Sequence, residues 1–583
     1  MKSLKGKTLK PLAAFVLAAA AVLAPLFLSD HALAQVTIPG PAQPGRAEEW
    51  LRNLPISPYR ISPGPIVREG EGAGLPDVDL SLTIKKVVIE GSTVFDQGDF
   101  QPIFSKYTGR EVPVAVIFQM AAEATAFYRG KGYILSQVIV PPQEVDGGVV
   151  RLQVVEGYVD NVVVEGEDGS RRDLVLAMTS KITRSRPLHS DDLERYLLLA
   201  GDLAGLQVQG FLSPSSSAPG AATLTVKTTY DRFEAAFQVA NYGSEYVGPW
   251  TGSFGITENS LLGLHERIGV RLQTAPSVDE LLFGEIVGSV PIGTEGTTVY
   301  GRLSNSASDP GNGLQQFGVT NDSLYVTVGA RHPLIRSRRQ NLFIDGRFDW
   351  VDLNSDSTTF GDISDDKLRV LRLTADYDFV DSWFGALMPA VTTISGRISI
   401  GLDAFGATKS GDPLASRTGA DGTFTTLWAD FQRQQRLPMR GVNLLVAARG
   451  QYAFEELLSS EEIGFGGMDF LRGYDPSTIL GDRGIAGKAE LQYTRPVDFG
   501  QYLQSYQLYA FLDAGVIENI NFDGLGNNKT NALYSTGGGI RLASANSLEF
   551  DLGLAALLND NRNNVKNLGT DNLRLLFKVT GRF

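Results

Sequence analysis

The chain has 583 residues, a formal net charge of −13 at pH 7 and no cysteine. An acidic chain without a basic, aromatic-rich patch is a poor nucleic-acid binder, and the lack of cysteine excludes disulfide frameworks, thiolate metal sites and cysteine nucleophiles. The length exceeds what one soluble core usually supports, and it predicts two to four domains.

Residues 1–34 have the pattern of a secretory signal peptide. Four lysines among the first ten residues precede an apolar run over 11–28, and Ala32-Leu33-Ala34 is a small-residue cleavage site. An uncleaved anchor helix is the alternative, but Pro25 interrupts the run. No later stretch approaches ~18 consecutive apolar residues. A mature chain that spans a membrane would therefore do so as a β-barrel.

Residues 35–80 hold eight prolines, which is the composition of a linker. Within this linker, residues 46–54 form a candidate short helix, and Trp50, Leu51 and Leu54 would give it an apolar stripe. A helix of this length is too short to be stable alone in water. We therefore expect it either to dock on another part of the protein or to stay disordered.

A segment of eight residues recurs after 75 residues. IKKVVIEG begins at Ile84 and VDNVVVEG begins at Val159, and four of the eight positions are identical. Each copy opens a stretch with strand, helix, helix, strand, strand order. Helical periodicity over 115–128 marks the first stretch, and Ser190 is a candidate N-cap in the second. These repeats predict two tandem α+β modules, at 81–157 and 158–230.

From residue 231 to residue 583 helical periodicity disappears, and alternating apolar and polar residues recur between clusters of Gly, Asn, Asp and Ser. The last segment, Leu573 to Phe583, has one apolar face and one mostly polar face, as suits a strand between lipid and a watery lumen. An edge strand of a soluble sandwich is the alternative. The count of such segments predicts a barrel of sixteen antiparallel strands, an even number that is typical of bacterial outer-membrane barrels.

Other chemistry is poorly supported by the sequence. The three histidines after residue 34, His189, His265 and His332, are far apart and lack the spacing of metal ligands. No Gly-x-Ser-x-Gly elbow lies on a strand-to-helix turn. Residues 354–366 are rich in carboxylates and could bind Ca²⁺, but a solvated extracellular loop explains them better. The sequence therefore indicates no metal, no cofactor and no enzyme active site.

The first module contains FYRGKGYILSQVIVPPQEVDGGVVRLQVVEG, residues 127–157. This stretch resembles the POTRA domain of two-partner secretion transporters, the TpsB family of ShlB/FhaC/HecB-like haemolysin secretion/activation proteins. The second module resembles the next POTRA domain, although Ala204-Gly205 replaces the family's Pro-Gly. The resemblance covers residues from about 80 to 583. It implies POTRA domains ahead of an outer-membrane barrel at 231–583, and by placement alone it implies that residues 46–54 are a plug helix.

The most specific barrel motif lies within residues 464–484. The family carries Val-Arg-Gly-Tyr/Phe on a long loop that folds into the barrel, which here would be residues 455–483. This chain reads Leu471-Arg472-Gly473-Tyr474, with leucine in the first place. The resemblance implies that Arg472 lies at the tip of this inward loop.

A second motif, AFLDAG at residues 510–515, resembles the family's Phe-x-Asp-x-Gly through Phe511, Asp513 and Gly515, which share one face of the strand. The resemblance pairs Arg472 with Asp513 on the inner barrel wall. An aspartate on the lipid face would be costly, so Asp513 is expected to face the lumen, and Arg472 inside the barrel would need a partner. Gly473 would let the backbone turn tightly. A surface loop with an exposed arginine is the alternative.

The resemblance implies an outer-membrane translocase that exports a partner exoprotein, adhesin-like or haemolysin-like, from the periplasm to the cell surface. Its partners would be the exoprotein's N-terminal secretion domain, outer-membrane lipid, and the barrel-assembly machinery, which reads a C-terminal aromatic residue such as Phe583. An outer-membrane insertase is the first alternative, but it would carry more than two POTRA modules. A passive porin or receptor is the second, and it would need neither the modules nor the inward loop.

Overall fold

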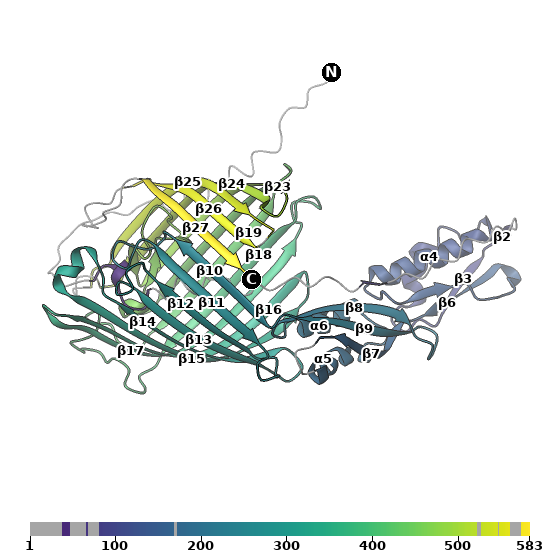
Figure 1. Ribbon diagram of the computed structural model, residues 1–583. Helices are drawn as coiled ribbons and strands as arrows, with labels where there is room; N and C mark the ends of the chain where they lie inside the picture. The colour runs from purple at the N-terminus through teal and green to yellow at the C-terminus, as the bar shows by residue number, and fades with distance from the viewer. Residues whose placement is uncertain are drawn as a thin grey trace, which may run out of the picture.

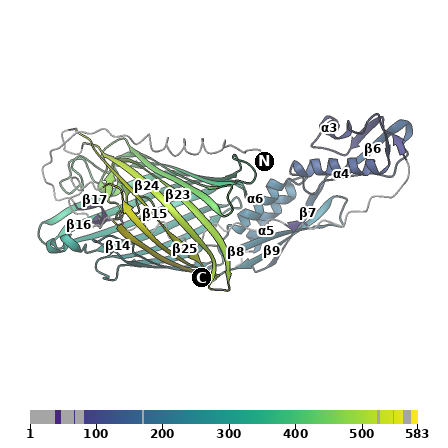
Figure 2. The same cartoon turned by 90° about the horizontal axis from the view of Figure 1, so that it is seen from above.

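The computed structural model describes residues 38–46, 66–67, 81–167, 172–521, 526–545, 547–559 and 573–583. The signal peptide at 1–34 and the plug-helix residues Trp50, Leu51 and Leu54 lie outside the described residues. Figures 1 and 2 show a large barrel with an arm of two smaller units, one behind the other, projecting from one rim. Within the described ranges, no helix is both long enough and apolar enough to cross a membrane.

The outer unit of the arm is an α+β fold. Its elements are β2 (Ser81–Thr83), β3 (Lys86–Glu90), η2 (Gln97–Phe100), α3 (Gln101–Phe104), β4 (Glu111–Pro113), α4 (Ala115–Gly130), β5 (Gln137–Ile139), η3 (Asp146–Gly148) and β6 (Val149–Val155). β6 lies between β3, which is parallel to it, and β5, which is antiparallel. The core forms where α4 places Met120 and Tyr128 against Phe100, Phe104 and Leu152.

The inner unit repeats this plan. Its elements are β7 (Tyr158–Gly166), α5 (Arg172–Thr179), η4 (Ser180–Arg184), α6 (Ser190–Gly201), β8 (Leu206–Pro214) and β9 (Ala221–Tyr230). The recurring sequence segment forms an edge strand in both units, β3 and β7, and each is parallel to the last strand of its unit. A two-residue strand from the linker, β1 (Ile66–Val67), adds in parallel to the opposite edge, at β8.

A histidine rather than Ser190 caps α6, so the predicted N-cap is wrong by one residue. The side chain of His189 accepts a hydrogen bond from the Asp191 amide at 3.3 Å, and Ser190 is the first helical residue. His189 also lies against the outer unit, because a Cβ on Gly132 (φ +94°) would come within 2.5 Å of its Nε2. The cap of α6 is therefore part of the contact between the two units.

Sixteen antiparallel strands close into the barrel, as predicted. They are β10 (Phe233–Ala240), β11 (Thr251–Asn259), β12 (Arg267–Thr274), β13 (Leu282–Ile292), β14 (Thr297–Ser308), β15 (Val319–Arg336), β16 (Gln340–Ser357), β17 (Gly361–Asp381), β18 (Ala390–Gly401), β19 (Thr425–Arg436), β20 (Val442–Ala453), β23 (Arg483–Phe499), β24 (Leu503–Asn519), β25 (Lys529–Ala543), β26 (Leu548–Leu557) and β27 (Leu573–Arg582). The helical turn η5 (Asn312–Phe317) lies between β14 and β15.

The two faces of the barrel wall differ as the alternation predicts. On β26, Phe550, Leu552 and Leu554 point outward and are exposed, whereas Asp551 and Ala555 point inward and are buried. An outward apolar band suits lipid, and the inward polar side chains line the lumen.

Residues 354–366 are not a loop, so that prediction is wrong. β16 continues to Ser357 and β17 begins at Gly361, with residue pairs such as Leu353 with Asp366. Beneath the acidic tip, Val351, Leu353 and Leu368 belong to a buried cluster. The strands extend here because their ladder satisfies the backbone polar groups, which a composition rich in Asp and Ser does not reveal.

Candidate functional site

The chain between β20 and β23 folds back into the barrel. It contains η6 (Ser459–Glu461) and a small hairpin of β21 (Ile463–Phe465) with β22 (Ile479–Gly481). Apolar side chains of this loop and of the wall form one buried cluster, made of Ala447, Ile463, Phe465, Phe470, Leu471, Tyr474, Ile479, Ala486, Ile517 and Leu533. Packing therefore holds the loop in the lumen, and the alternative of an exposed surface loop does not describe it.

The tip of this loop is a tight turn over Leu471–Tyr474, closed by a hydrogen bond of 2.9 Å from the Tyr474 amide to the Leu471 carbonyl. The left-handed residue is Leu471, at φ +58°, and not Gly473. The glycine is needed for a different reason than the predicted one. A Cβ on Gly473 would lie 3.1 Å from the Cβ of Ser535, so a side chain here would crowd the wall and glycine avoids this.

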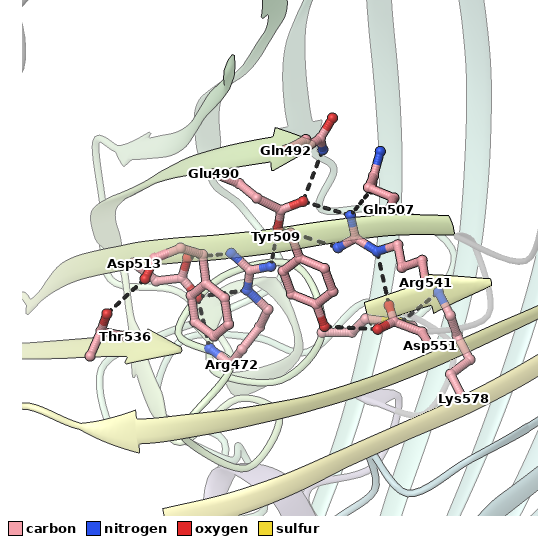
Figure 3. Close-up of polar contacts among 12 residues, drawn as sticks. Arg472, Glu490, Gln492, Gln507, Tyr509, Asp513, Thr536, Arg541, Asp551 and Lys578 are labelled. Atoms are coloured by element: carbon pink, nitrogen blue, oxygen red, sulfur yellow. Dashed lines mark hydrogen bonds and ion pairs between the residues drawn. The ribbon is translucent and has the colours of Figure 1, made fainter. Parts of the chain in front are cut away.

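Arg472 is buried and makes several contacts with Asp513 on β24 (Figure 3). Its Nη2 donates to Oδ1 at 2.9 Å, its Nε donates to Oδ2 at 3.0 Å, and its backbone amide donates to Oδ2 at 3.1 Å. The guanidinium also lies 3.5 Å from the centroid of the Phe511 ring. Such a bidentate, stacked geometry fits arginine and not lysine.

The three residues of the strand motif serve the loop in three ways. Because side chains alternate along β24, Phe511, Asp513 and Gly515 all face the lumen. Phe511 supplies the stacking surface and Asp513 the carboxylate. Gly515 supplies space, because a Cβ there would lie 3.0 Å from Cδ1 of Leu471.

The ion pair continues into a chain of charges that the motif does not reveal. Glu490 on β23 accepts a hydrogen bond from Nη1 of Arg472 and, at 2.6 Å, from Nη1 of Arg541 on β25. Arg541 then reaches Asp551 on β26 at 3.1 Å, and the Tyr509 hydroxyl donates to Asp551 at 2.7 Å. The loop tip thus sits at one end of a network across four neighbouring strands (Figure 3).

The sequence carried a signal for this network. Glu490, Arg541 and Asp551 occupy lumen-facing positions on β23, β25 and β26, where polar residues are expected but complementary charges are not. Only the strand register shows that they lie at one level.

The aromatic end of the motif is anchored on the wall. The Tyr474 hydroxyl donates to the carbonyl oxygens of Asn559, at 2.7 Å, and Tyr534, at 3.1 Å. The carbonyl of Tyr474 accepts a hydrogen bond of 2.6 Å from Nη1 of Arg574 on β27. The tip is therefore tied to β24, β25 and β27 at once.

The start of the described chain also touches this loop. η1 (Gly40–Ala42) lies inside the barrel end remote from the arm (Figure 1), and a Cβ on Gly40 would come within 2.3 Å of the Ser477 carbonyl oxygen. Arg46, the first residue of the candidate plug helix, is buried and donates to the Glu462 carbonyl at 3.0 Å.

The chemistry of this site fits the holding of the loop in position. The network pairs three carboxylates with two guanidinium groups, and it offers no nucleophile next to a base. Across the described residues, no three or more His, Asp or Glu side chains are arranged to hold a metal ion. A buried ion pair adds little net stability, but it strongly penalises loss of one partner. Such an arrangement positions the loop.

Comparison with known proteins places the chain in a family. Residues 222–542 match the family of haemolysin secretion/activation proteins ShlB/FhaC/HecB, and residues 82–157 match the ShlB-type POTRA domain. The chain belongs to the ShlB/FhaC/HecB family. It is accordingly an outer-membrane protein transporter of the two-partner secretion class, with its POTRA domains in the periplasm.

Similar members come from several bacteria. The heme/hemopexin transporter protein HuxB of Haemophilus influenzae is 23% identical over 484 residues, which cover 79% of this chain and 81% of the relative. The hemolysin transporter protein HpmB of Proteus mirabilis is 22% identical over 421 residues, covering 71% and 72%. The solved structure of CdiB from Escherichia coli is 19% identical, covers 93% of this chain and 96% of its own, and has a TM-score of 0.67. It supports the fold of the ShlB/FhaC/HecB family.

Proposed function

We propose that this transporter moves one partner exoprotein, in an extended state, from the periplasm through its barrel to the cell surface. The observation that carries the proposal is the loop seated in the lumen by Arg472. A polypeptide that crosses the barrel must displace this loop. Because the seat is built from ion pairs, hydrogen bonds and packing, it can open and reform without a chemical step.

The periplasmic arm offers a docking mode for an extended chain. β1 already pairs in parallel with β8, through Ile66 with Phe211 and Val67 with Leu212. This edge of the inner unit thus accepts an added strand, which uses main-chain hydrogen bonds and demands no fixed sequence. We propose that the N-terminal secretion domain of the exoprotein adds here in place of β1.

A cavity of about 680 Å³ between the inner unit and the barrel would receive the exoprotein segment next. Its lining includes the apolar Leu203 and Val208 of the arm and the charged Arg302, Arg331, Asp345 and Asp376 of the wall. The charges are largely matched; Arg331, for example, lies 3.1 Å from Asp376. A wall of largely paired charges stays hydrated yet holds no passing segment tightly, because most of these charges already have partners.

The experiment compares surface exposure of the neighbouring large exoprotein in cells that lack this chain and are complemented with the wild type or with Arg472→Ala. The substitution leaves Asp513 and Glu490 without their shared partner, and loss of one partner of a buried pair is worth about 3–5 kcal/mol. We expect the wild type to restore surface exoprotein and Arg472→Ala to restore about tenfold less or lower still.

Arg495→Ala is the matched control, because Arg495 is an exposed arginine on β23 that points to the opposite face of the strand from Glu490. It should restore export fully. Heat-modifiable migration of each barrel on gels establishes that it is folded. If cells without the chain still expose the exoprotein while other outer-membrane barrels fail to assemble, the protein is an insertase and the proposal is wrong.

A further inference from the structure

The barrel closes where its first and last strands, β10 and β27, meet. Among the described residues this seam has five paired positions, Ala236–Ala240 against Lys578–Arg582, whereas β10 shares eight with β11 and β27 shares nine with β26. At the rim that faces the arm, Phe583 lengthens the seam through two main-chain hydrogen bonds to Ala235, of 2.8 and 3.0 Å. At the far end, no main-chain hydrogen bond between residues that the structure describes extends the seam beyond Asn241, so this end depends on side chains.

Asn241 provides the first of these. Its Nδ2 donates to the Leu575 carbonyl at 2.8 Å, and its Oδ1 accepts from the Phe577 amide at 2.7 Å. The side-chain amide thus bonds to β27 as a further strand residue would. Its own backbone amide donates to the Phe577 carbonyl at 3.1 Å.

Arg574, one step further along β27, joins the seam to the inward loop. Its Nη2 donates to the Gly243 carbonyl at 2.8 Å, which ties β27 to the segment after β10. Its Nη1 donates to the Tyr474 carbonyl at 2.6 Å and lies 3.1 Å from Oδ1 of Asp475. One guanidinium of β27 therefore bonds at the same time to the β10 side of the seam and to the loop tip.

The loop also backs the seam from the lumen. Ala240 and Tyr242 from the β10 side and Leu576 from β27 belong to one buried cluster with Tyr509, Phe511 and Ala555, and Met468 of the loop packs against it. Phe511 is the residue on which Arg472 stacks. The seat of the loop and the inner surface of the seam thus share side chains.

We propose that the seated loop holds closed the half of the β10–β27 seam that is remote from the arm. Arg574 is the positioning residue that couples the loop to the seam. When the loop leaves its seat, Arg574 loses Tyr474 and Asp475, and the cluster around Ala240 and Leu576 loses its cover. The loop and the seam then loosen together. For export, the consequence would be a barrel wall that loosens at the seam only while the loop is out of the lumen. This consequence rests on the proposed function, but the coupling between loop and seam does not.

The experiment measures how fast a membrane-impermeant maleimide labels a single cysteine placed at Ala240, whose side chain is buried on the lumen side of the seam. The chain has no native cysteine, so the signal is unambiguous. The purified full-length barrel is labelled with and without Arg574→Met, which removes the charge and keeps the length. We expect labelling to become at least about fivefold faster in Arg574→Met, as local opening becomes more frequent.

Arg582→Met is the matched control. Arg582 lies on the same strand and pairs at 2.7 Å with Glu549, away from the loop, so its loss should change the rate by less than about twofold. If Arg574→Met does not yield a folded barrel, Asp475→Asn replaces it, because this change weakens only the loop side of the Arg574 contacts. Labelling at Ala240 that is unchanged in a folded variant of either kind overturns the proposal.

A second arm separates coupling through the loop from a purely local role of Arg574. Arg472→Ala releases the loop from the other end of its seat and does not touch β27. Coupling requires that it also accelerate labelling at Ala240; if only Arg574→Met does so, the loop does not control the seam. Because no exoprotein is present in either arm, a failure of export would leave these rates unaffected, and the two proposals fail separately.

Discussion

Gly515 shows, at the scale of single residues, how closely the loop fits the wall. A Cβ there would lie 3.0 Å from Cδ1 of Leu471 and 3.2 Å from Cβ of Ala486, both closer than ordinary contact. We expect Gly515→Ala to destabilise the seated loop by about 1–3 kcal/mol, because the added methyl overpacks a filled site. The measurement is maleimide labelling of a cysteine at Ser535, a position that is buried beneath Gly473. This cysteine should react faster in Gly515→Ala than in the parent.

Two further variants test whether crowding is the cause. Leu471→Ala removes Cδ1 without placing a β-branched residue at the left-handed φ of this position. Adding Gly515→Ala to Leu471→Ala should therefore speed labelling much less than Gly515→Ala does in the parent. Gly487→Ala is the neutral control, since its nearest atom would be 3.6 Å away. Equal labelling in Gly515→Ala and Gly487→Ala would contradict the expectation.

Sequence and structure diverge at this scale in an instructive way. The resemblance paired Arg472 with Asp513, and their side chains lie 2.9 Å apart. It did not lead to Glu490, because that contact depends on how far β23 is staggered against β24, and alternation along one strand carries no information about stagger. The turn conformation also differs from the expectation, because Leu471, and not Gly473, is in the left-handed conformation.

At the scale of elements, the edge strand β3 of the outer unit is covered by a side chain. Oε1 of Gln97 accepts from the Ile89 amide at 2.9 Å, and its Nε2 donates to the Val87 carbonyl at 3.0 Å. The carboxamide therefore occupies the main-chain groups that an added strand would use. This edge is closed, whereas the β8 edge of the inner unit carries an added strand.

We expect Gln97→Leu to expose these groups. Loss of a hydrogen bond worth about 0.5–1.5 kcal/mol should speed hydrogen exchange at the Ile89 amide about two- to tenfold. Gln143→Leu is the reciprocal control, because Gln143 accepts from the Arg151 amide at 2.8 Å on β6. It should speed exchange at Arg151 and leave Ile89 unchanged. An Ile89 amide that exchanges at the parent rate in Gln97→Leu would show that Gln97 does not protect the edge.

Secondary-structure elements could be predicted where buried and exposed residues alternate regularly along the sequence, and not where such a pattern is missing. The barrel strands alternate between lipid and lumen, so their number could be read from the sequence. The β16–β17 tip at 354–366 lies where both faces carry polar residues, and there a strand and a loop have the same composition. The inward course of residues 455–483 came only from resemblance, because packing partners such as Ile517 and Leu533 lie on later strands whose position beside the loop is not visible in the sequence.

At the scale of the whole molecule, the arm is fixed to the barrel on one side. Glu295, in the turn between β13 and β14, pairs with Lys181 and, at 3.4 Å, with Arg195 of the inner unit. Beside it, Arg336 at the end of β15 makes two hydrogen bonds of 2.7 Å to Asp202. The chain itself connects the two parts elsewhere, at Tyr230–Phe233. Breaking these ion pairs would therefore loosen the arm on this side of the barrel.

We expect Glu295→Gln to widen the range of distances between spin labels on cysteines at Ser213, on β8, and Arg440, in the turn between β19 and β20. Both positions are exposed. The effect should be modest, about 0.2–1 kcal/mol per pair, because Glu295 is partly exposed. Burial raises the pKa of Glu295, but Lys181 and Arg195 outweigh burial and hold that pKa below its usual range.

The sign of the pH dependence follows from that direction. Because the folded-state pKa is lowered, the stabilisation is complete above the pKa of an unperturbed glutamate, about 4.3, and is lost as the pH falls through the lowered value. The parent and Glu295→Gln should therefore differ by a constant amount at pH 6 to 8, in the periplasmic range, and converge only in acid below about pH 4. A parent arm that loosened between pH 8 and 6 would mean that another group, and not this carboxylate, holds the joint.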